Sequence, residues 1–199
     1  MTVLRRTTLS IALLGTLAAC GGSSNPLGNP PVVSNPQSTQ GNQHLSFAYF
    51  QRCINPIFLA QLQSQGSATT NTCAGGGCHD TVTGTGGAFR LVAAAPTLDV
   101  SDPANTPDLV RAADIYKNFY SAQGMVVVNT TQSRLVVKPL VAGVFHGGGQ
   151  VFPSENDPNI KLFKYWITHP APLGQDEFST ATYTMFTPAD PKTGTCNTQ

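Results

Sequence analysis

Two cysteines and a histidine lie close together near the middle of the chain, in a spacing that suits attachment of a cofactor. Cys73 and Cys78 are separated by Ala-Gly-Gly-Gly, and His79 follows the second cysteine directly. Two thiols add to the two vinyl groups of a haem, and a histidine next to the second thiol reaches the iron; this chemistry underlies the C-x-x-C-H signature. The small residues of the longer gap let the backbone approach a flat macrocycle closely. The segment therefore predicts one covalently attached haem c, with His79 as an axial ligand.

Three other uses of this segment compete with the haem. The two cysteines could form a disulfide, they could bind zinc together with His79, or they could act as a redox-active dithiol. Paired zinc ligands are usually spaced by two to four residues, but adjacent Cys78 and His79 suit one tetrahedral ion poorly. A simple disulfide leaves the histidine after Cys78 unexplained. Haem attachment accounts for all three residues.

A haem iron bound by His79 has one axial position left. His146 is the favoured ligand, because the glycines at 147–149 give its loop the backbone freedom to turn an imidazole onto a flat ring. An iron with two protein ligands favours electron transfer, whereas an open position permits binding of a gas or a peroxide. An open position therefore stays an alternative, and the other candidate ligands are His44, His169, Met1, Met125 and Met185.

The N-terminus has the composition of an export signal. Arg5 and Arg6 precede a short apolar run, and Leu-Ala-Ala leads into Cys20. This resembles a bacterial lipobox, so residues 1–19 are expected to be removed and Cys20 to be lipidated. Lipid chains tether a protein to a membrane surface without a spanning helix. We expect a cell-envelope lipoprotein facing the periplasm or the cell surface, with the outer membrane favoured because Gly21 is not acidic.

Residues 20–43 are rich in Gly, Ser, Asn, Pro and Gln and predict a flexible linker ahead of a folded domain at 44–199. Removal of the signal lowers the Lys and Arg count from 11 to 9, against 10 acidic residues. A chain so nearly neutral has no electrostatic footprint for nucleic acid. The expected partners are the membrane, through the lipid anchor, and a redox protein.

Export also places the remaining cysteines outside the reducing cytosol. Apart from the pair at the haem motif, these are Cys53 and Cys196, which are the natural partners for a disulfide. The bond would hold the C-terminal tail, 175–199, against the first helix of the domain. Two unpaired thiols, or a link to another chain, are the alternatives.

Three stretches have the apolar spacing of helices packed on a core. The first, 46–62, contains Pro56, which we expect to kink or split it. The second, 107–122, and the third, 158–168, each begin with a capping residue followed by proline, a pair that suits the N-cap and first helical positions. Pro170 ends the third.

The remainder of the domain is expected to be irregular. A short strand is predicted at 125–128, and either a strand or a helical turn at 134–139. The chain carries only 11% charged residues, with 19 glycines and 15 prolines, which indicates a loop-rich protein. The predicted fold class is mainly α, a small loop-rich helical domain around one haem.

Three pieces of the sequence together resemble a cytochrome-c-like domain of the planctomycete type, similar to class I monohaem cytochromes c. The first is the helical segment with Asn55 to Phe58 ahead of the Cys-Cys-His motif. The second is Ser133 to Leu140, followed by His146 to Gly149. The third is the last helix with Tyr165 to Ile167 and a proline soon after. The pieces cover about residues 45–172, and the departures are the four-residue cysteine gap and the Cys53/Cys196 pair.

The resemblance implies a helical cytochrome c core in which the segments at 46–62 and 158–168 pack against each other around the haem. It also implies that Trp166 lies in the core near the porphyrin, with plain core packing as the alternative role. The family element His-Gly-Gly adds to the case for His146 as the second axial ligand.

The residues point to an electron carrier rather than an enzyme, with the haem iron cycling between ferrous and ferric states. The sequence contains no nucleophile elbow, no HExxH and no phosphate-binding loop. The alternatives are a haem that binds or senses a small ligand, a subunit of a redox enzyme, and a module in which the motif holds zinc or a disulfide.

Overall fold

The computed structural model describes residues 44–199, so the expected signal peptide, the linker at 20–43 and Cys20 lie outside the described residues. The first element is one helical run with a change of pitch. It begins as α1 (Phe47–Tyr49), continues as the π-helix η1 (Phe50–Ile54) and ends as α2 (Asn55–Leu59). The Ser46 hydroxyl caps the start by accepting from the Tyr49 N–H at 3.1 Å.

The wider η1 turn explains how this run carries Pro56 without breaking. The Asn55 N–H donates to the carbonyl of Phe50, an i to i−5 bond, so the ladder has shifted by one residue before the proline is reached. The expected kink or split is therefore a change of helix type. The helical run stops at Leu59, and Leu62, which we expected at its end, belongs to a strand.

Two helices follow where one was expected. α3 (Pro107–Ala112) and α4 (Asp114–Gln123) are separated by Ala113, whose backbone is extended. The break lets α4 bury its apolar face independently of α3, so Leu109, expected on that face, is 59% exposed. The prediction of a continuous helix over 107–122 was wrong in this respect.

The last two helices complete the core. α5 (Arg134–Leu140) settles the choice at 134–139 in favour of a helix, and α6 (Pro158–Thr168) has the predicted bounds, with the Asp157 carboxylate accepting from the Asn159 N–H at 2.8 Å. No strand forms at 125–128 in the described part of the chain. Within residues 44–199 no helix is long and apolar enough to cross a membrane.

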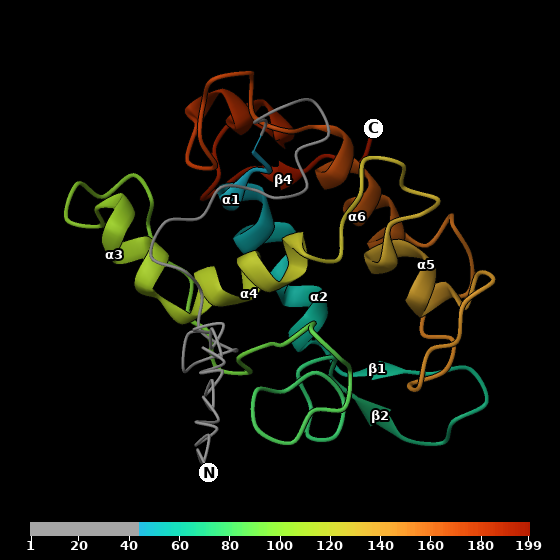
Figure 1. Ribbon diagram of the computed structural model, residues 1–199. Helices are drawn as coiled ribbons and strands as arrows, with labels where there is room; N and C mark the ends of the chain where they lie inside the picture. The colour runs from blue at the N-terminus through green and yellow to red at the C-terminus, as the bar shows by residue number, and fades with distance from the viewer. Residues whose placement is uncertain (1–43) are drawn as a thin grey trace, which may run out of the picture.

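An aromatic cluster holds the N-terminal run, α4 and α6 together, and α4 crosses the N-terminal run at the centre of Figure 1. Phe50 lies against Phe119 at 5.3 Å and against Trp166 at 5.4 Å between ring centroids. The Trp166 indole is fully buried and donates to the Ser46 carbonyl at 2.9 Å. Trp166 thus packs in the core, with its N–H paired as burial requires, and its nearness to a porphyrin stays a prediction.

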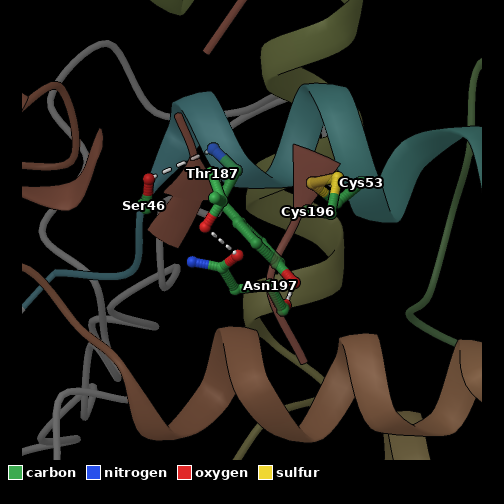
Figure 2. Close-up of a disulfide and its surroundings, with 6 residues drawn as sticks. Ser46, Cys53, Thr187, Cys196 and Asn197 are labelled. Atoms are coloured by element: carbon green, nitrogen blue, oxygen red, sulfur yellow. Dashed lines mark hydrogen bonds between the residues drawn. A yellow bond between two sulfur atoms is a disulfide. The ribbon is translucent and has the colours of Figure 1, made fainter. Parts of the chain in front are cut away.

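The tail is more ordered than the irregular segment we expected. It contains the 3-10 helix η2 (Thr180–Met185) and a hairpin of β3 (Phe186–Thr187) and β4 (Thr195–Cys196). Cys196 on β4 forms a disulfide with Cys53 on η1, with 6.1 Å between the Cα atoms, as expected (Figure 2). The disulfide joins the tail to the first helical run.

A second two-stranded hairpin lies at the opposite end of the molecule from β4 (Figure 1). β1 (Leu62–Gln63) pairs with β2 (Thr70–Asn71) in antiparallel register, Leu62 opposite Asn71. The long loop that follows carries the Cys73–His79 segment. Loop and short helices, with little sheet, make up the part that the structure describes, and the cytochrome c-like arrangement stays a prediction.

Candidate haem site

The Cys73–His79 segment forms a tight loop closed by its own backbone. The His79 N–H donates to the Cys73 carbonyl at 3.0 Å, and the Ala74 N–H ties the loop to the Phe58 carbonyl at the end of α2. Gly77 has a φ of 77°, in the left-handed region that favours glycine. The loop is therefore closed by a backbone hydrogen bond between its two ends, Cys73 and His79.

Close packing explains a second glycine of the loop. A Cβ on Gly75 would lie 2.2 Å from the Asn71 side-chain oxygen. The neighbour that needs the space is a side chain of β2, whereas sequence reasoning assigned the small residues to approach of a macrocycle.

Both thiols of the motif are free and partly buried. Burial raises the pKa of the Cys73 thiol to about 11, and the neighbouring Cys78 adds to the effect. The Asn71 amide lies 3.5 Å from the Cys78 sulfur and donates to it. At neutral pH Cys73 is thus a neutral thiol.

His79 is held so that one ring nitrogen is occupied and the other is not. Its Nδ1 lies 3.1 Å from the Phe89 carbonyl, and the Phe89 ring packs on the imidazole at 4.7 Å between centroids. Burial lowers the pKa of His79, so the neutral form is favoured. With a proton on Nδ1 donated to the carbonyl, Nε2 carries the lone pair that binds a metal.

Gly86 completes the pocket behind this imidazole. A Cβ at Gly86 would lie 2.0 Å from the His79 Nδ1, so no larger residue fits without moving the ring. The Gly86 N–H donates to the Cys78 carbonyl at 2.9 Å, and the Leu91 N–H to the His79 carbonyl at 2.7 Å. The segment at 86–91 therefore wraps His79 on the side away from its free nitrogen.

His146 is held in the same manner on a separate loop. Its Nδ1 lies 2.7 Å from the Gly149 carbonyl, which again leaves Nε2 as the unprotonated nitrogen. Gly148 packs against the ring, since a Cβ there would lie 3.2 Å from Cε1. This loop follows α5, and Gly149 has a φ of 72°, which permits the turn back toward the imidazole.

The two imidazoles lie close together although 67 positions separate them in the chain. Their centroids are 6.3 Å apart and their planes differ by 15°. An iron that binds two imidazole nitrogens at about 2 Å each, with ring centres roughly 1 Å beyond the nitrogens, holds the centres about 6 Å apart. The separation and the two free Nε2 atoms fit a bis-histidine haem.

The other candidate ligands in the described residues are engaged elsewhere. The His44 Nδ1 lies 3.4 Å from the buried Glu177 carboxylate. His169 stacks on Tyr165 at 3.8 Å and bonds its carbonyl. Met185 is buried in the core and Met125 packs against it. Met1 lies outside the described residues.

The structure lacks two of the alternatives to haem, a disulfide within the motif and a zinc site, among the described residues. Cys73 and Cys78 do not form a disulfide with each other. Among residues 44–199, no three His, Cys, Asp or Glu side chains converge as ligands for one metal ion, whereas a structural zinc site takes four. Gly86 and Phe89, which contact the His79 ring, were not predicted from the sequence. The Gly-Gly pair at 86–87 is the one sequence feature that could have indicated close packing there.

No protein-family model, no curated protein and no solved structure matches this chain.

Proposed function

We propose that this chain is a c-type cytochrome with one haem, held by thioethers from Cys73 and Cys78 and by axial bonds from His79 and His146. The observation that carries the proposal is the pair of nearly parallel imidazoles, 6.3 Å apart, next to two free thiols. Each imidazole is oriented by a backbone carbonyl on Nδ1, the second partner that haem and metal histidines commonly have.

Haem attachment requires two free thiols, and Cys73 and Cys78 are both free. Each thiol adds across one vinyl group: the sulfur bonds one carbon, the hydrogen ends on the other, and no atom is lost. The buried, neutral Cys73 thiol reacts poorly in the folded chain, because the thiolate is the nucleophile. We therefore expect attachment before the loop folds.

When bound, the haem supplies a one-electron change at its iron. The chain's own residues would then have three tasks: the cysteines would hold the porphyrin, the carbonyls of Phe89 and Gly149 would orient the two imidazoles, and His79 and His146 would bind the iron. An iron with two protein ligands favours electron transfer over ligand chemistry. Two imidazoles also place the potential below that of a histidine–methionine pair.

The cellular setting of the proposal comes from the sequence. Lipid on Cys20 and the linker at 20–43 would tether the domain to a membrane of the cell envelope, facing the periplasm or the cell surface. The proposed role is transfer of single electrons between redox proteins at that surface, without turnover of a substrate by the chain itself.

Replacement of the second axial histidine tests the proposal. The protein is produced in a host competent for cytochrome maturation, and spectra are recorded in both oxidation states. We expect a low-spin spectrum for the wild type that changes only slowly under carbon monoxide. His146→Ala should give a high-spin ferric form, and its ferrous form should bind carbon monoxide.

His169→Ala is the matched control, since that histidine is tied to Tyr165 and should leave the spectrum unchanged. Unchanged low-spin character in His146→Ala would exclude His146 as the ligand. A wild type that binds carbon monoxide rapidly would favour a small-ligand binding or sensing function instead.

A further inference from the structure

The β1–β2 hairpin reaches the loop that carries His146. The Ser64 hydroxyl donates to the Gly148 carbonyl, and the Gln65 N–H donates to the Gln150 carbonyl at 2.7 Å. A Cβ at Gly149 would lie 3.5 Å from the Ser64 Cβ, ordinary van der Waals contact. Gly148 and Gly149 are the residues that pack against His146 and accept from its Nδ1.

The same hairpin also contacts the cysteine loop. Asn71, opposite Leu62 in β2, donates to the Cys78 sulfur and fills the space beside Gly75. The hairpin thus touches the segment of His79 with one strand and the segment of His146 with the turn that begins at Ser64. A shift of the hairpin would change the separation of the two imidazoles.

The His146 loop has few other attachments. Phe145, next to His146, is 82% exposed, so apolar burial does not anchor this side. The Lys138 ammonium donates to the Phe145 carbonyl at 2.7 Å at an exposed position, where such a bond contributes little to stability. The Val151 N–H donates to the Pro139 carbonyl at 2.8 Å and fixes the far end of the loop.

We propose that Ser64 is a positioning residue that keeps His146 on the haem iron, with the hairpin acting as a clamp between the two ligand loops. This inference rests on the proposed bis-histidine haem. The clamp makes the sixth ligand slow to leave, which keeps the protein an electron carrier. Loss of the Ser64 hydroxyl weakens the clamp without touching either histidine.

The rate at which the ferrous protein binds carbon monoxide tests the clamp, because the gas binds only while His146 is off the iron. One hydrogen bond of about 1 kcal/mol corresponds to about a fivefold change in the open fraction. Ser64→Ala should therefore bind carbon monoxide about fivefold faster than wild type. Ser64→Thr retains the hydroxyl and should restore the wild-type rate.

Ser67→Ala is the matched control, since the Ser67 hydroxyl bonds only Thr69 within the hairpin turn, and the substitution leaves the Ser67 backbone bonds in place. Ser67→Ala should bind carbon monoxide at the wild-type rate. Ser64→Ala should lower the free energy of unfolding in urea by no more than the one hydrogen bond, about 1 kcal/mol, so that a wider loss of structure is excluded. Equal rates for Ser64→Ala and Ser67→Ala, with a low-spin bis-histidine spectrum intact, would overturn the clamp and leave the cytochrome standing. Absence of haem from the wild type would instead overturn the proposed function.

Discussion

Gly86→Ala should disturb the iron while leaving the fold largely intact. The added Cβ would lie 2.0 Å from Nδ1 and 2.2 Å from Cε1 of His79, far inside van der Waals contact. The ring must therefore rotate or shift, and its bond to the Phe89 carbonyl is lost. A buried group forced to move costs about 1–3 kcal/mol, which includes about 1 kcal/mol for the hydrogen bond.

In the proposed haem protein, this cost would weaken the iron–His79 bond and would also lower the free energy of unfolding. A shift of 1–3 kcal/mol corresponds to roughly a 5- to 150-fold change in the equilibrium between bound and displaced histidine. We expect the ferric spectrum of Gly86→Ala to gain a high-spin component, measured by absorption and electron paramagnetic resonance, and the ferrous form to bind carbon monoxide.

Gly87→Ala is the control for this experiment. Gly87 has a φ of 71° and nothing within 4 Å of its would-be Cβ, so alanine there adds backbone strain without touching His79. The strain costs about 1–2 kcal/mol. Both variants should lower the unfolding midpoint, but only Gly86→Ala should change the spin state. Identical low-spin spectra for the two variants would refute the placement of Gly86 against an iron ligand.

Three further predictions concern the disulfide, a buried ion pair and the Cys73 thiol. Replacing Cys53 and Cys196 by serine removes a link across 143 positions and should lower the free energy of unfolding by about 5 kcal/mol in urea titrations; an unchanged midpoint would contradict this. Glu177→Ala removes the buried carboxylate that accepts from the Arg111 Nε at 2.9 Å and from the Tyr116 hydroxyl at 2.8 Å. The free energy of unfolding, measured by the same urea titration, should fall by about 3 kcal/mol. A fall of less than about 1 kcal/mol would show that the ion pair is solvated. In apoprotein made without haem attachment, iodoacetamide should alkylate Cys73 at a rate that rises up to about pH 11, because burial raises its pKa and the thiolate is the reactive form. Mass spectrometry of the peptide measures that rate, and a plateau near pH 9 would contradict the burial.

Local signals were sufficient where one residue type decides the structure. The Asp157 cap and Pro158 place the start of α6, and the cap is observed. Once Cys20 and the Cys73/Cys78 pair were set aside, Cys53 and Cys196 were the cysteines left to pair, and they form a disulfide. Each of these depends on a short-range rule or on elimination, so no knowledge of the three-dimensional packing was needed.

Predictions failed where distant contacts decide. The apolar run at 125–128 has strand composition, but the Met125 carbonyl accepts from the Leu135 N–H and the Ser133 hydroxyl. The Met125 and Val126 N–H groups donate to carbonyls at the end of α4, so these groups are paired without a partner strand. The break at Ala113 frees α3 from the face of α4 and lets Arg111 reach Glu177 in the tail. Ser133 lies 8 positions from Met125 and Glu177 lies 66 positions from Arg111, beyond the short windows that define a strand or a helix pattern.

The candidate site shows the same division. Spacing alone singled out Cys73, Cys78 and His79, and flexibility of the glycine run singled out His146. The sequence did not reveal the carbonyls of Phe89 and Gly149 that orient the two rings, because a backbone acceptor carries no residue signature. Gly86 was likewise invisible, since its importance lies in the 2.0 Å approach to His79.

The mass of the intact mature protein tests the central claim most directly. Because addition of two thiols to two vinyl groups loses no atom, the account predicts a mass equal to the processed chain plus one whole haem, which survives denaturation, and neither Cys73 nor Cys78 open to alkylation. A colourless protein at the mass of the bare chain, with both thiols alkylated, after production in a host that matures other c-type cytochromes, would contradict it.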